Sequence, residues 1–367
     1  MPDQKDKDLP GWQGEVHHVN PSAYRKNSPV VNIPTIAAQR KHPALLHEAL
    51  IMSKSPRPKP SHHASTVVEL SDGEFMAAWF GGAFEGKPDV GIWTSTWRRG
   101  ADSWSPPAEV VKPLGAPTWN PVLFKHDASG ELLLFYKVGQ KPLSWKGFLK
   151  RSSDDGKTWG PPEELGPGIV GPAKNKPIEL EDGTILSGSS DEGGRDGKEW
   201  TTWVEESRDK GRTWSRIGPI ELEGRIIQPS LFRGKSGDVR MVIRTRKRFM
   251  ALAKGNSAGH GWSNPTLTDI PCPNSGIDAV TLRDGRILLV YNHSFKRGVA
   301  GRSVLSVALS HDDGETWKRI LTLEDTGSRV VEFSYPAVIQ ARNGEVLVSY
   351  TWGRQNIKVV LLDPKKL

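Results

Sequence analysis

The sequence predicts an all-β fold, a six-bladed β-propeller, and three observations support this prediction. The 367-residue chain is rich in glycine (38) and proline (28) and nearly lacks the Ala-, Leu- and Glu-rich stretches of helical proteins. An eight-residue motif ending in tryptophan recurs along it. Asp-Gly and Asn-Gly pairs separate short apolar runs, as in β-hairpins. Repeats of about 50 residues, each with several strands, are typical of propeller blades.

The recurring motif reads Ser-x-Asp-x-Gly-x-Thr-Trp, the Asp-box pattern. In it the Asp can accept backbone N–H groups of a turn and the Gly can adopt a positive φ. Degenerate copies begin at Trp104 and Trp262, and the five tryptophans are 55, 55, 48 and 55 residues apart. We expect these motifs on the outer rim, in a structural role. The three complete copies are Ser152 to Trp159, Ser207 to Trp214 and Ser310 to Trp317.

Each repeat also contains a hairpin in which an apolar run follows the turn. The segment 332–364 has strands but no motif, so we expect it to complete the last blade together with N-terminal residues and thereby close the ring. Residues 41–367 then form one propeller, and the polar, Pro-rich residues 1–40 form an extended or poorly ordered leader. The turns are Asp72-Gly73, Asp182-Gly183, Asp284-Gly285 and Asn343-Gly344, and the runs are Phe75 to Phe80, Ile185 to Ser187, Ile287 to Tyr291 and Val346 to Tyr350.

Composition narrows the location of the protein and its partners. No apolar run approaches the roughly 18 residues of a membrane helix. The single Cys272 permits no intramolecular disulfide, and the N-terminus has no apolar signal core, so we expect a cytoplasmic protein, or a secreted one if a signal has been removed. The net charge of +8 favours anionic partners, although solubility alone also explains it. Because the basic residues are scattered and no nucleic-acid motif occurs, we expect an acidic oligosaccharide or glycoconjugate as partner, with no nucleic acid or membrane.

The motifs and their spacing over about residues 60–362 resemble the sialidase superfamily. Sialidases use an Asp acid/base, a Tyr nucleophile paired with a Glu, and three Arg that bind the substrate carboxylate. The resemblance implies that Asp89, in EGKPDVGIW, is the acid/base and that Tyr335, in EFSYPAV, is the nucleophile. Glu85 in the same loop as Asp89 is a second carboxylate. A turn cap for Asp89 and a core position for Tyr335 are the alternatives.

The resemblance also assigns arginines to the carboxylate. Arg244 and Arg246, in MVIRTRKR, are two residues apart, so a strand would point both at one anion. Arg302, in GRSVLSVALS, precedes the third motif as another such Arg does. Arg suits bidentate carboxylate binding. A surface salt bridge is the alternative for each.

Two positions depart from the sialidase pattern. His63, or its neighbour His62, stands in SHHASTVVEL where the first carboxylate-binding Arg is expected. The Glu that pairs with the Tyr aligns near Ile226, and Gln228 is the nearest polar residue. Such a chain is poorly equipped for ordinary sialic acid cleavage. An imidazole such as that of His63 can act as acid or base near neutral pH.

Further polar residues recur where the other blades begin, and we expect them to line a pocket for an anionic ligand: Asn120, Lys174, Asn175 and Asp278. No phosphate-binding loop, dinucleotide fingerprint or zinc-ligand spacing occurs, so we expect no cofactor, while a loop-bound calcium stays open. Three functions remain: a sialidase-like hydrolase of an acidic sugar; a uronic-acid-specific glycosidase or lyase on the same fold, the lyase using Tyr335 and a His; and a non-catalytic propeller that binds carbohydrate or protein.

Overall fold

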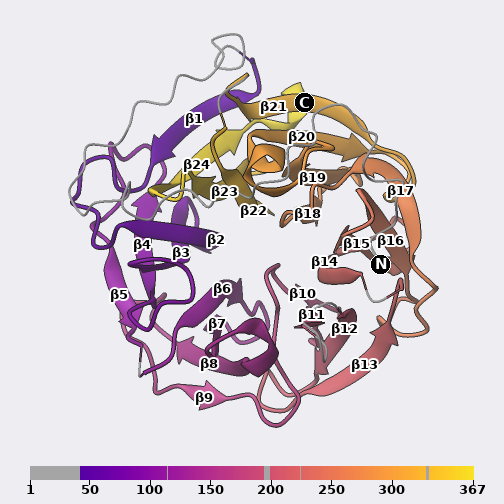
Figure 1. The fold of residues 1–367 in the computed structure, drawn as a ribbon, viewed down its shortest axis with the longest axis horizontal. Coiled ribbons are helices and arrows are strands. Elements are labelled where there is room, and N and C mark those ends of the chain that lie inside the picture. The colour runs from indigo at the N-terminus through magenta and orange to yellow at the C-terminus, as the bar shows by residue number, and fades with distance from the viewer. Residues whose placement is uncertain (1–41, 114, 194–198, 224, 328–329) are drawn as a thin grey trace.

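The computed structural model describes residues 42–113, 115–193, 199–223, 225–327 and 330–367. Within these residues, 24 strands form six four-stranded antiparallel sheets, which surround a common axis as the blades of a propeller (Figure 1). The predicted fold is thus confirmed. None of the helices described is long and apolar enough to span a bilayer. The leader expected at residues 1–40 lies outside the described part.

Blades 1 to 3 follow the chain, each from its inner strand to its outer strand. Blade 1 holds β2 (Ser61–Ser71), β3 (Glu74–Gly82), β4 (Gly91–Arg98) and β5 (Ala108–Val111). Blade 2 holds β6 (Thr118–Lys125), β7 (Leu132–Val138), β8 (Lys146–Ser152) and β9 (Glu163–Glu164), with the 3-10 helix η4 (Pro142–Ser144) between β7 and β8. Blade 3 holds β10 (Ile178–Glu179), β11 (Ile185–Glu192), β12 (Trp200–Ser207) and β13 (Ser215–Ile220).

Blades 4 and 5 repeat the pattern, and blade 6 takes one strand from the other end of the chain. Blade 4 holds β14 (Ile226–Arg233), β15 (Val239–Thr245), β16 (Phe249–Lys254) and β17 (Thr266–Pro271). Blade 5 holds β18 (Asp278–Thr281), β19 (Ile287–Asn292), β20 (Val304–Ser310) and β21 (Lys318–Asp325), with η5 (Gly298–Arg302) before β20. Blade 6 holds β22 (Phe333–Gln340), β23 (Val346–Trp352), β24 (Asn356–Leu362) and β1 (Leu45–Leu50), and η6 (Pro364–Lys366) follows β24.

The ring closes as the sequence predicts. The strand β1 pairs antiparallel with β24, so an N-terminal segment becomes the outer strand of the C-terminal blade. This pairing removes the free edge that β24 would otherwise present. The four predicted hairpin turns all lie between the first and second strands of their blades, and the apolar runs lie inside β3, β11, β19 and β23.

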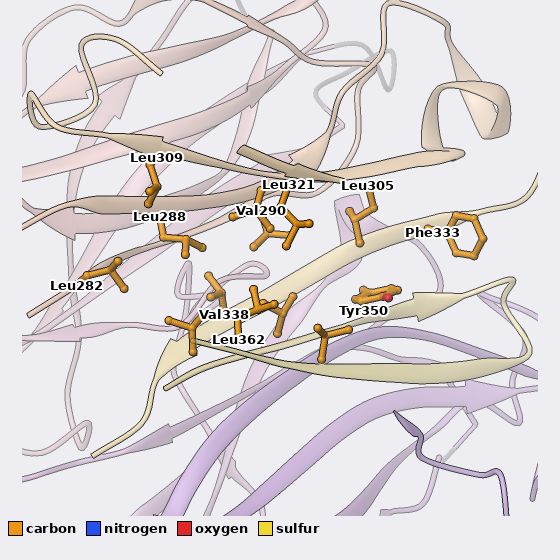
Figure 2. Close-up of a cluster of buried hydrophobic side chains, with 14 of the residues drawn as sticks. Leu282, Leu288, Val290, Leu305, Leu309, Leu321, Phe333, Val338, Tyr350 and Leu362 are labelled. Carbon is orange, nitrogen blue, oxygen red and sulfur yellow. The ribbon is translucent and has the colours of Figure 1, made fainter. Parts of the chain in front are cut away.

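Apolar side chains fill the space between neighbouring blades. Between blades 5 and 6, Leu288 and Val290 of β19 face Val338 of β22 and Tyr350 of β23, and all four are buried (Figure 2). Both strands are buried on both faces and are apolar along most of their length, as such strands require. Burial of each such side chain contributes roughly 1.5–3 kcal/mol. This packing holds the inner strands in place around the axis.

The three complete Asp boxes form the same turn after the third strand of blades 2, 3 and 5. In blade 3, Asp209 accepts hydrogen bonds from the backbone N–H and hydroxyl of Thr213 at 2.8 and 2.6 Å, and from the hydroxyl of Ser207 at 2.9 Å. Gly211 has a φ of 77° and donates its N–H to Ser207 at 2.8 Å. These contacts lie within the turn itself, at the face opposite the starts of the inner strands, and their role is structural.

The antiparallel order places all candidate site residues at one end of the ring. The tight turns between first and second strands and the Asp boxes occupy one face, so the starts of the inner strands and the loops between second and third strands occupy the other. Four inner strands carry a bulge near their start, with a left-handed residue in each: Ala64, Asn120, Gln228 and Tyr335. A left-handed φ is uncommon outside glycine and marks a position fixed by its surroundings.

Candidate functional site

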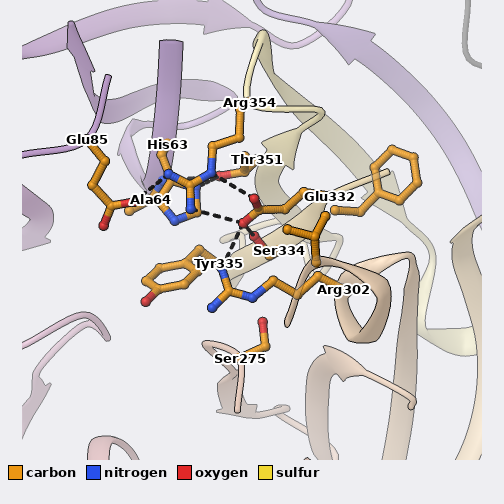
Figure 3. A network of polar contacts seen from close by, with 12 residues as sticks. His63, Ala64, Glu85, Ser275, Arg302, Glu332, Ser334, Tyr335, Thr351 and Arg354 are labelled. Atoms are coloured by element: carbon orange, nitrogen blue, oxygen red, sulfur yellow. Dashed lines mark hydrogen bonds and ion pairs between the residues drawn. The ribbon is translucent and has the colours of Figure 1, made fainter. Parts of the chain in front are cut away.

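Tyr335 is the third residue of β22 and sits in the bulge between Ser334 and Ala337, with a φ of 53°. A bulge re-aims the side chain that it carries. The residue is buried, with 8% of its surface exposed. It packs against the imidazole of His63, with 4.4 Å between the ring centroids (Figure 3). Blades 1 and 6 thus meet at Tyr335.

Arg244, near the end of β15, holds the phenol oxygen. Its Nη1 donates to Oη of Tyr335 at 2.8 Å and to Oε1 of Gln228 at 2.8 Å, and its Nε donates to Oδ1 of Asn274 at 2.9 Å. The guanidinium also lies over the ring of Trp200, 5.4 Å from the centroid. A positive group hydrogen-bonded to a phenol oxygen stabilises negative charge that develops there.

A buried carboxylate ties two further arginines together. Glu332 accepts hydrogen bonds from Nη1 of Arg302 at 2.8 Å and from Nε of Arg354 at 2.8 Å (Figure 3). Burial alone would raise the pKa of Glu332, but Arg354 and Arg302 outweigh it and hold the pKa well below its usual range. The Arg302 guanidinium lies over the Tyr335 ring, 5.5 Å from the centroid. Glu332 therefore stays ionised and orients both guanidiniums.

The two histidines of β2 are buried and neutral. Burial lowers the pKa of His63 well below its usual value, and Arg354 lowers it further. Nδ1 of His63 lies 2.8 Å from the hydroxyl of Thr351. In His62, Nδ1 accepts from Trp79 at 2.9 Å, so Nε2 carries the hydrogen that reaches the carbonyl of Lys59 at 2.8 Å. Burial lowers the pKa of His62 to about 3. Thus His63 faces Tyr335, whereas both ring nitrogens of His62 are committed to blade 1 and its preceding loop.

The two carboxylates of the 83–90 loop have different partners. Asp89 accepts the backbone N–H of Ala83 at 3.0 Å and the ammonium of Lys59 at 3.2 Å. Its side chain is 43% exposed. Glu85 accepts from Nη1 of Arg354 and so points towards the centre of the ring beside His63 (Figure 3). We call the central cluster the hub; it comprises His63, Arg244, Arg302, Glu332, Tyr335 and Arg354. In this arrangement Asp89 closes its own loop, and Glu85 is the carboxylate of this loop that is linked to the arginine network.

Arg246 lies just beyond β15 and stacks on Trp200, with Cζ 3.5 Å from the ring centroid. Burial and the neighbouring Arg244 lower its pKa. The indole therefore lies under both guanidiniums, although Arg244 alone of the two hydrogen-bonds Tyr335. Arg246 is placed beside the hub, on the blade 3 side.

The remaining predicted polar residues bind backbone and side-chain groups of other blades. Asn120 donates to Ala173 O at 3.0 Å, and Asn175 donates to Gln228 O at 3.0 Å. Lys174 donates to the carbonyls of Ile277 and Pro336. Asp278 accepts from Lys176, Ser230 and the Val338 N–H at 3.0, 2.8 and 2.8 Å. These groups tie blades 2 to 6 together around the axis.

No set of three or more His, Cys, Asp or Glu in the described part of the chain is arranged to hold a metal ion. The hub instead combines a phenol, a neutral imidazole and three guanidiniums, of which two share a carboxylate. Such a set can bind an anion and stabilise charge on the phenol oxygen.

Comparison with known proteins gives the family. A model of the BNR repeat-like domain matches residues 73–348, more than half of the chain. The chain belongs to the BNR repeat-like domain family. No curated protein sequence matches this BNR propeller.

Solved structures share the fold of the BNR propeller. A protein of unknown function from Dyadobacter fermentans is 18% identical, with 87% of this chain and 98% of that chain covered and a TM-score of 0.71. The Hadza microbial sialidase Hz136 is 16% identical, with 84% and 67% covered and a TM-score of 0.69. The intramolecular trans-sialidase of Ruminococcus gnavus is 11% identical, with 88% and 98% covered and a TM-score of 0.65. At these identities the likeness shows a sialidase-like propeller fold.

Sequence reasoning missed four residues in or next to the BNR propeller's hub: Glu192, Trp200, Glu332 and Arg354. The sequence does carry a signal for the starts of the inner strands. Asn120, Gln228 and Tyr335 are each the third residue of an inner strand, and a proline follows each of them. Glu332 lies three residues before Tyr335. Arg354 follows β23 in a loop, and no local pattern marks it.

Proposed function

We propose that this protein cleaves the glycosidic bond of a carboxylate-bearing sugar in a glycan, with Tyr335 as nucleophile. The observation that carries the proposal is the 2.8 Å hydrogen bond from Arg244 to the phenol oxygen, with Arg302 over the same ring. Two guanidiniums thus contact Tyr335, one at the phenol oxygen and one over the ring. A neutral nucleophile avoids repulsion from an anionic substrate, as the sialidase exception to the two-carboxylate rule illustrates.

The proposed hydrolysis has two steps. Oη of Tyr335 bonds to the anomeric carbon as the bond to the leaving oxygen breaks, and a carboxylic acid of the 83–90 loop protonates that oxygen. Water then attacks the same carbon, the bond to Tyr335 breaks, and the loop carboxylate takes the proton of the water. We assign the loop role to Asp89, with Glu85 as the second candidate. His63 takes the phenol proton in the first step and returns it to the departing phenolate in the second, so that both side chains end neutral. Arg244 and Arg302 bind the substrate carboxylate and stabilise the leaving phenolate.

A uronic-acid lyase is the second candidate, and the pairing of His63 with Tyr335 favours it. In such a lyase one of the two groups takes the proton from C5, the electron pair forms the C4–C5 double bond, and the C4–oxygen bond breaks. The other group protonates the leaving oxygen. The arginines neutralise the carboxylate on C5, which makes the proton easier to remove. This reaction does not need a carboxylate at the position of Gln228.

The test is a panel of chromogenic sialosides and uronides with product analysis by mass spectrometry. Hydrolysis adds the mass of water to the products, whereas elimination releases an unsaturated sugar that absorbs in the near ultraviolet. The Tyr335→Phe variant should lose either activity and keep its circular dichroism spectrum. A carbohydrate-binding module without catalysis would bind the acidic sugars and turn over none of them, which would contradict the proposal.

A further inference from the structure

Glu192, the last residue of β11, is linked through the side chain of Gln228 to Arg244, the arginine that holds Tyr335. Its Oε1 accepts from Nε2 of Gln228 at 2.9 Å and from the hydroxyl of Ser190 at 3.2 Å. The backbone N–H of Gln228 in turn donates to Ser190 at 3.3 Å. The carboxylate and the hydroxyl therefore hold Gln228 at both its backbone and its amide.

The amide of Gln228 has a fixed orientation because its two ends meet opposite partners. Nε2 faces the carboxylate of Glu192, and Oε1 faces Nη1 of Arg244 at 2.8 Å. Rotating the amide by half a turn would place its oxygen against a carboxylate and its NH₂ against a guanidinium, which leaves four polar groups without suitable partners. Gln228 is only 1% exposed, so water cannot readily replace the lost contacts.

The orientation of Gln228 controls what Arg244 can donate. Nη1 carries two hydrogens, and its two acceptors are Oε1 of Gln228 and Oη of Tyr335, each at 2.8 Å. With one hydrogen directed to the amide oxygen, the other points to the phenol. A continuous chain of three hydrogen bonds thus joins Glu192 to Tyr335 through Gln228 and Arg244.

We propose that Glu192 is a positioning residue that orients the Gln228 amide and, through it, aims Arg244 at the phenol oxygen of Tyr335. The catalytic part of this inference rests on the proposed function. The residue that contacts Arg244 is the neutral Gln228. Glu192 lies on the other side of the Gln228 amide and supplies a carboxylate that acts on Tyr335 through Gln228 and Arg244. The positioning consists of contacts within the protein, so its effect on Tyr335 can be measured without any substrate.

The contact arm of the test uses the protein with ¹³Cζ-labelled tyrosine. The chain has five tyrosines, so Tyr335→Phe identifies the signal of Tyr335. Glu192→Gln removes the charge that enforces the orientation of Gln228, and we expect the Tyr335 signal to move. The matched control is Glu206→Gln on β12 of the same blade, where the carboxylate pairs with Arg208 and His260. A Tyr335 signal that stays in place in Glu192→Gln, or moves equally in both variants, would overturn the proposal.

The activity arm uses whichever acidic glycoside the native protein turns over. We expect Glu192→Gln to lower kcat about 10- to 100-fold, by analogy with groups that orient the ligands of metal centres, with KM nearly unchanged. Adding Gln228→Glu returns a carboxylate to Arg244 and should restore kcat. A loss of kcat that follows the loss of folded protein and is not rescued would contradict the positioning role. If the native protein turns over no glycoside while the Tyr335 signal still moves, the proposed function fails and the positioning stands.

Discussion

Lys174 of blade 3 reaches across the axis and donates its ammonium to the carbonyl of Pro336, the residue that follows Tyr335. The same ammonium donates to the carbonyl of Ile277 in blade 5 at 3.1 Å. The buried amino group of Lys174 thus ties together three blades next to the candidate nucleophile.

Lys174 should make the stability of the protein depend on pH. Burial lowers its pKa to about 7 from an ordinary 10.5. Between these two values the unfolded chain binds more protons than the folded chain, so the free energy of unfolding should rise with pH from about 7 to 10.5. Each such lysine contributes a slope of up to about 1.4 kcal/mol per pH unit.

The measurement is urea unfolding at several pH values from 7 to 9. We expect a smaller slope in Lys174→Met than in the native protein and no change in Lys112→Met, where the lysine is exposed. Burial lowers the pKa of Lys137 to about 7 as well, so part of the slope should persist in Lys174→Met. Equal slopes in the native protein and Lys174→Met would show that Lys174 keeps its proton on folding.

The Asp boxes should stabilise the rim without affecting the hub. Asp209→Ala removes the acceptor of Thr213 and Ser207 and should cost about 1–2 kcal/mol of unfolding free energy. Thr213→Val removes one of these bonds and should cost less. Denaturant unfolding measures both. A loss of activity in Asp209→Ala larger than the loss of folded protein would contradict the structural role.

The same aspartate predicts a weaker rim in acid. Burial of Asp209 opposes its ionisation, but the hydrogen bonds from Thr213 and Ser207 outweigh it and lower its pKa to about 2. The contribution of Asp209 to the free energy of unfolding is therefore present above its ordinary pKa of 3.8 and is lost as the pH falls towards 2. In acid unfolding monitored by tryptophan fluorescence, we expect native protein and Asp209→Ala to converge below pH 3; a constant difference down to pH 2 would be inconsistent with this assignment.

Arg302 should contribute to the binding of an acidic ligand. Arg302→Lys keeps the charge but loses the planar pair of donors, and loss of one charge-assisted hydrogen bond costs about 1.5–3 kcal/mol. We therefore expect affinity for the acidic sugar to fall by about 10- to 100-fold. Calorimetric titration measures this, with Arg98→Lys at the exposed end of β4 as control. Unchanged affinity would remove Arg302 from the site.

The leaving-group dependence of the rate should reveal the proton donor. If Asp89 protonates the leaving oxygen, Asp89→Asn should lower the rate on a natural glycan by about 10²–10⁴-fold. On a nitrophenyl glycoside, whose leaving group needs no proton, the loss should be small. Glu85→Gln tested in parallel decides between the two carboxylates. An equally large loss on both substrates would mean that Asp89 acts by closing its loop on Ala83 and Lys59.

The fold could be predicted because its signals are local. Each Asp box and each Asp-Gly turn contains its own hydrogen-bond partners within a few residues, as Asp209 and Thr213 show. The spacing of the motif then fixed the number of blades, and the missing motif after residue 332 indicated that an N-terminal strand closes the ring.

The hub was harder to predict because its contacts join residues far apart in the chain. Glu332 meets Arg354 across a hairpin, and Glu192 meets Gln228 across a gap of 36 residues. Tyr335 faces Arg244 through a left-handed bulge, which reverses the simple alternation of side chains along a strand. Arg246 lies just beyond the end of β15 and shares the Trp200 ring with Arg244, and this contact again joins residues of different blades.

The central claim is that Tyr335, held by Arg244, bonds covalently to an acidic sugar. Incubation with fluorinated acidic glycosyl fluorides, in which departure of the first leaving group is fast and hydrolysis of the intermediate slow, should leave an adduct. Peptide mapping by mass spectrometry should then find the sugar on Tyr335, and Tyr335→Phe should stay unlabelled. Turnover of an acidic glycoside without an adduct, or with an adduct on another residue, would contradict the account.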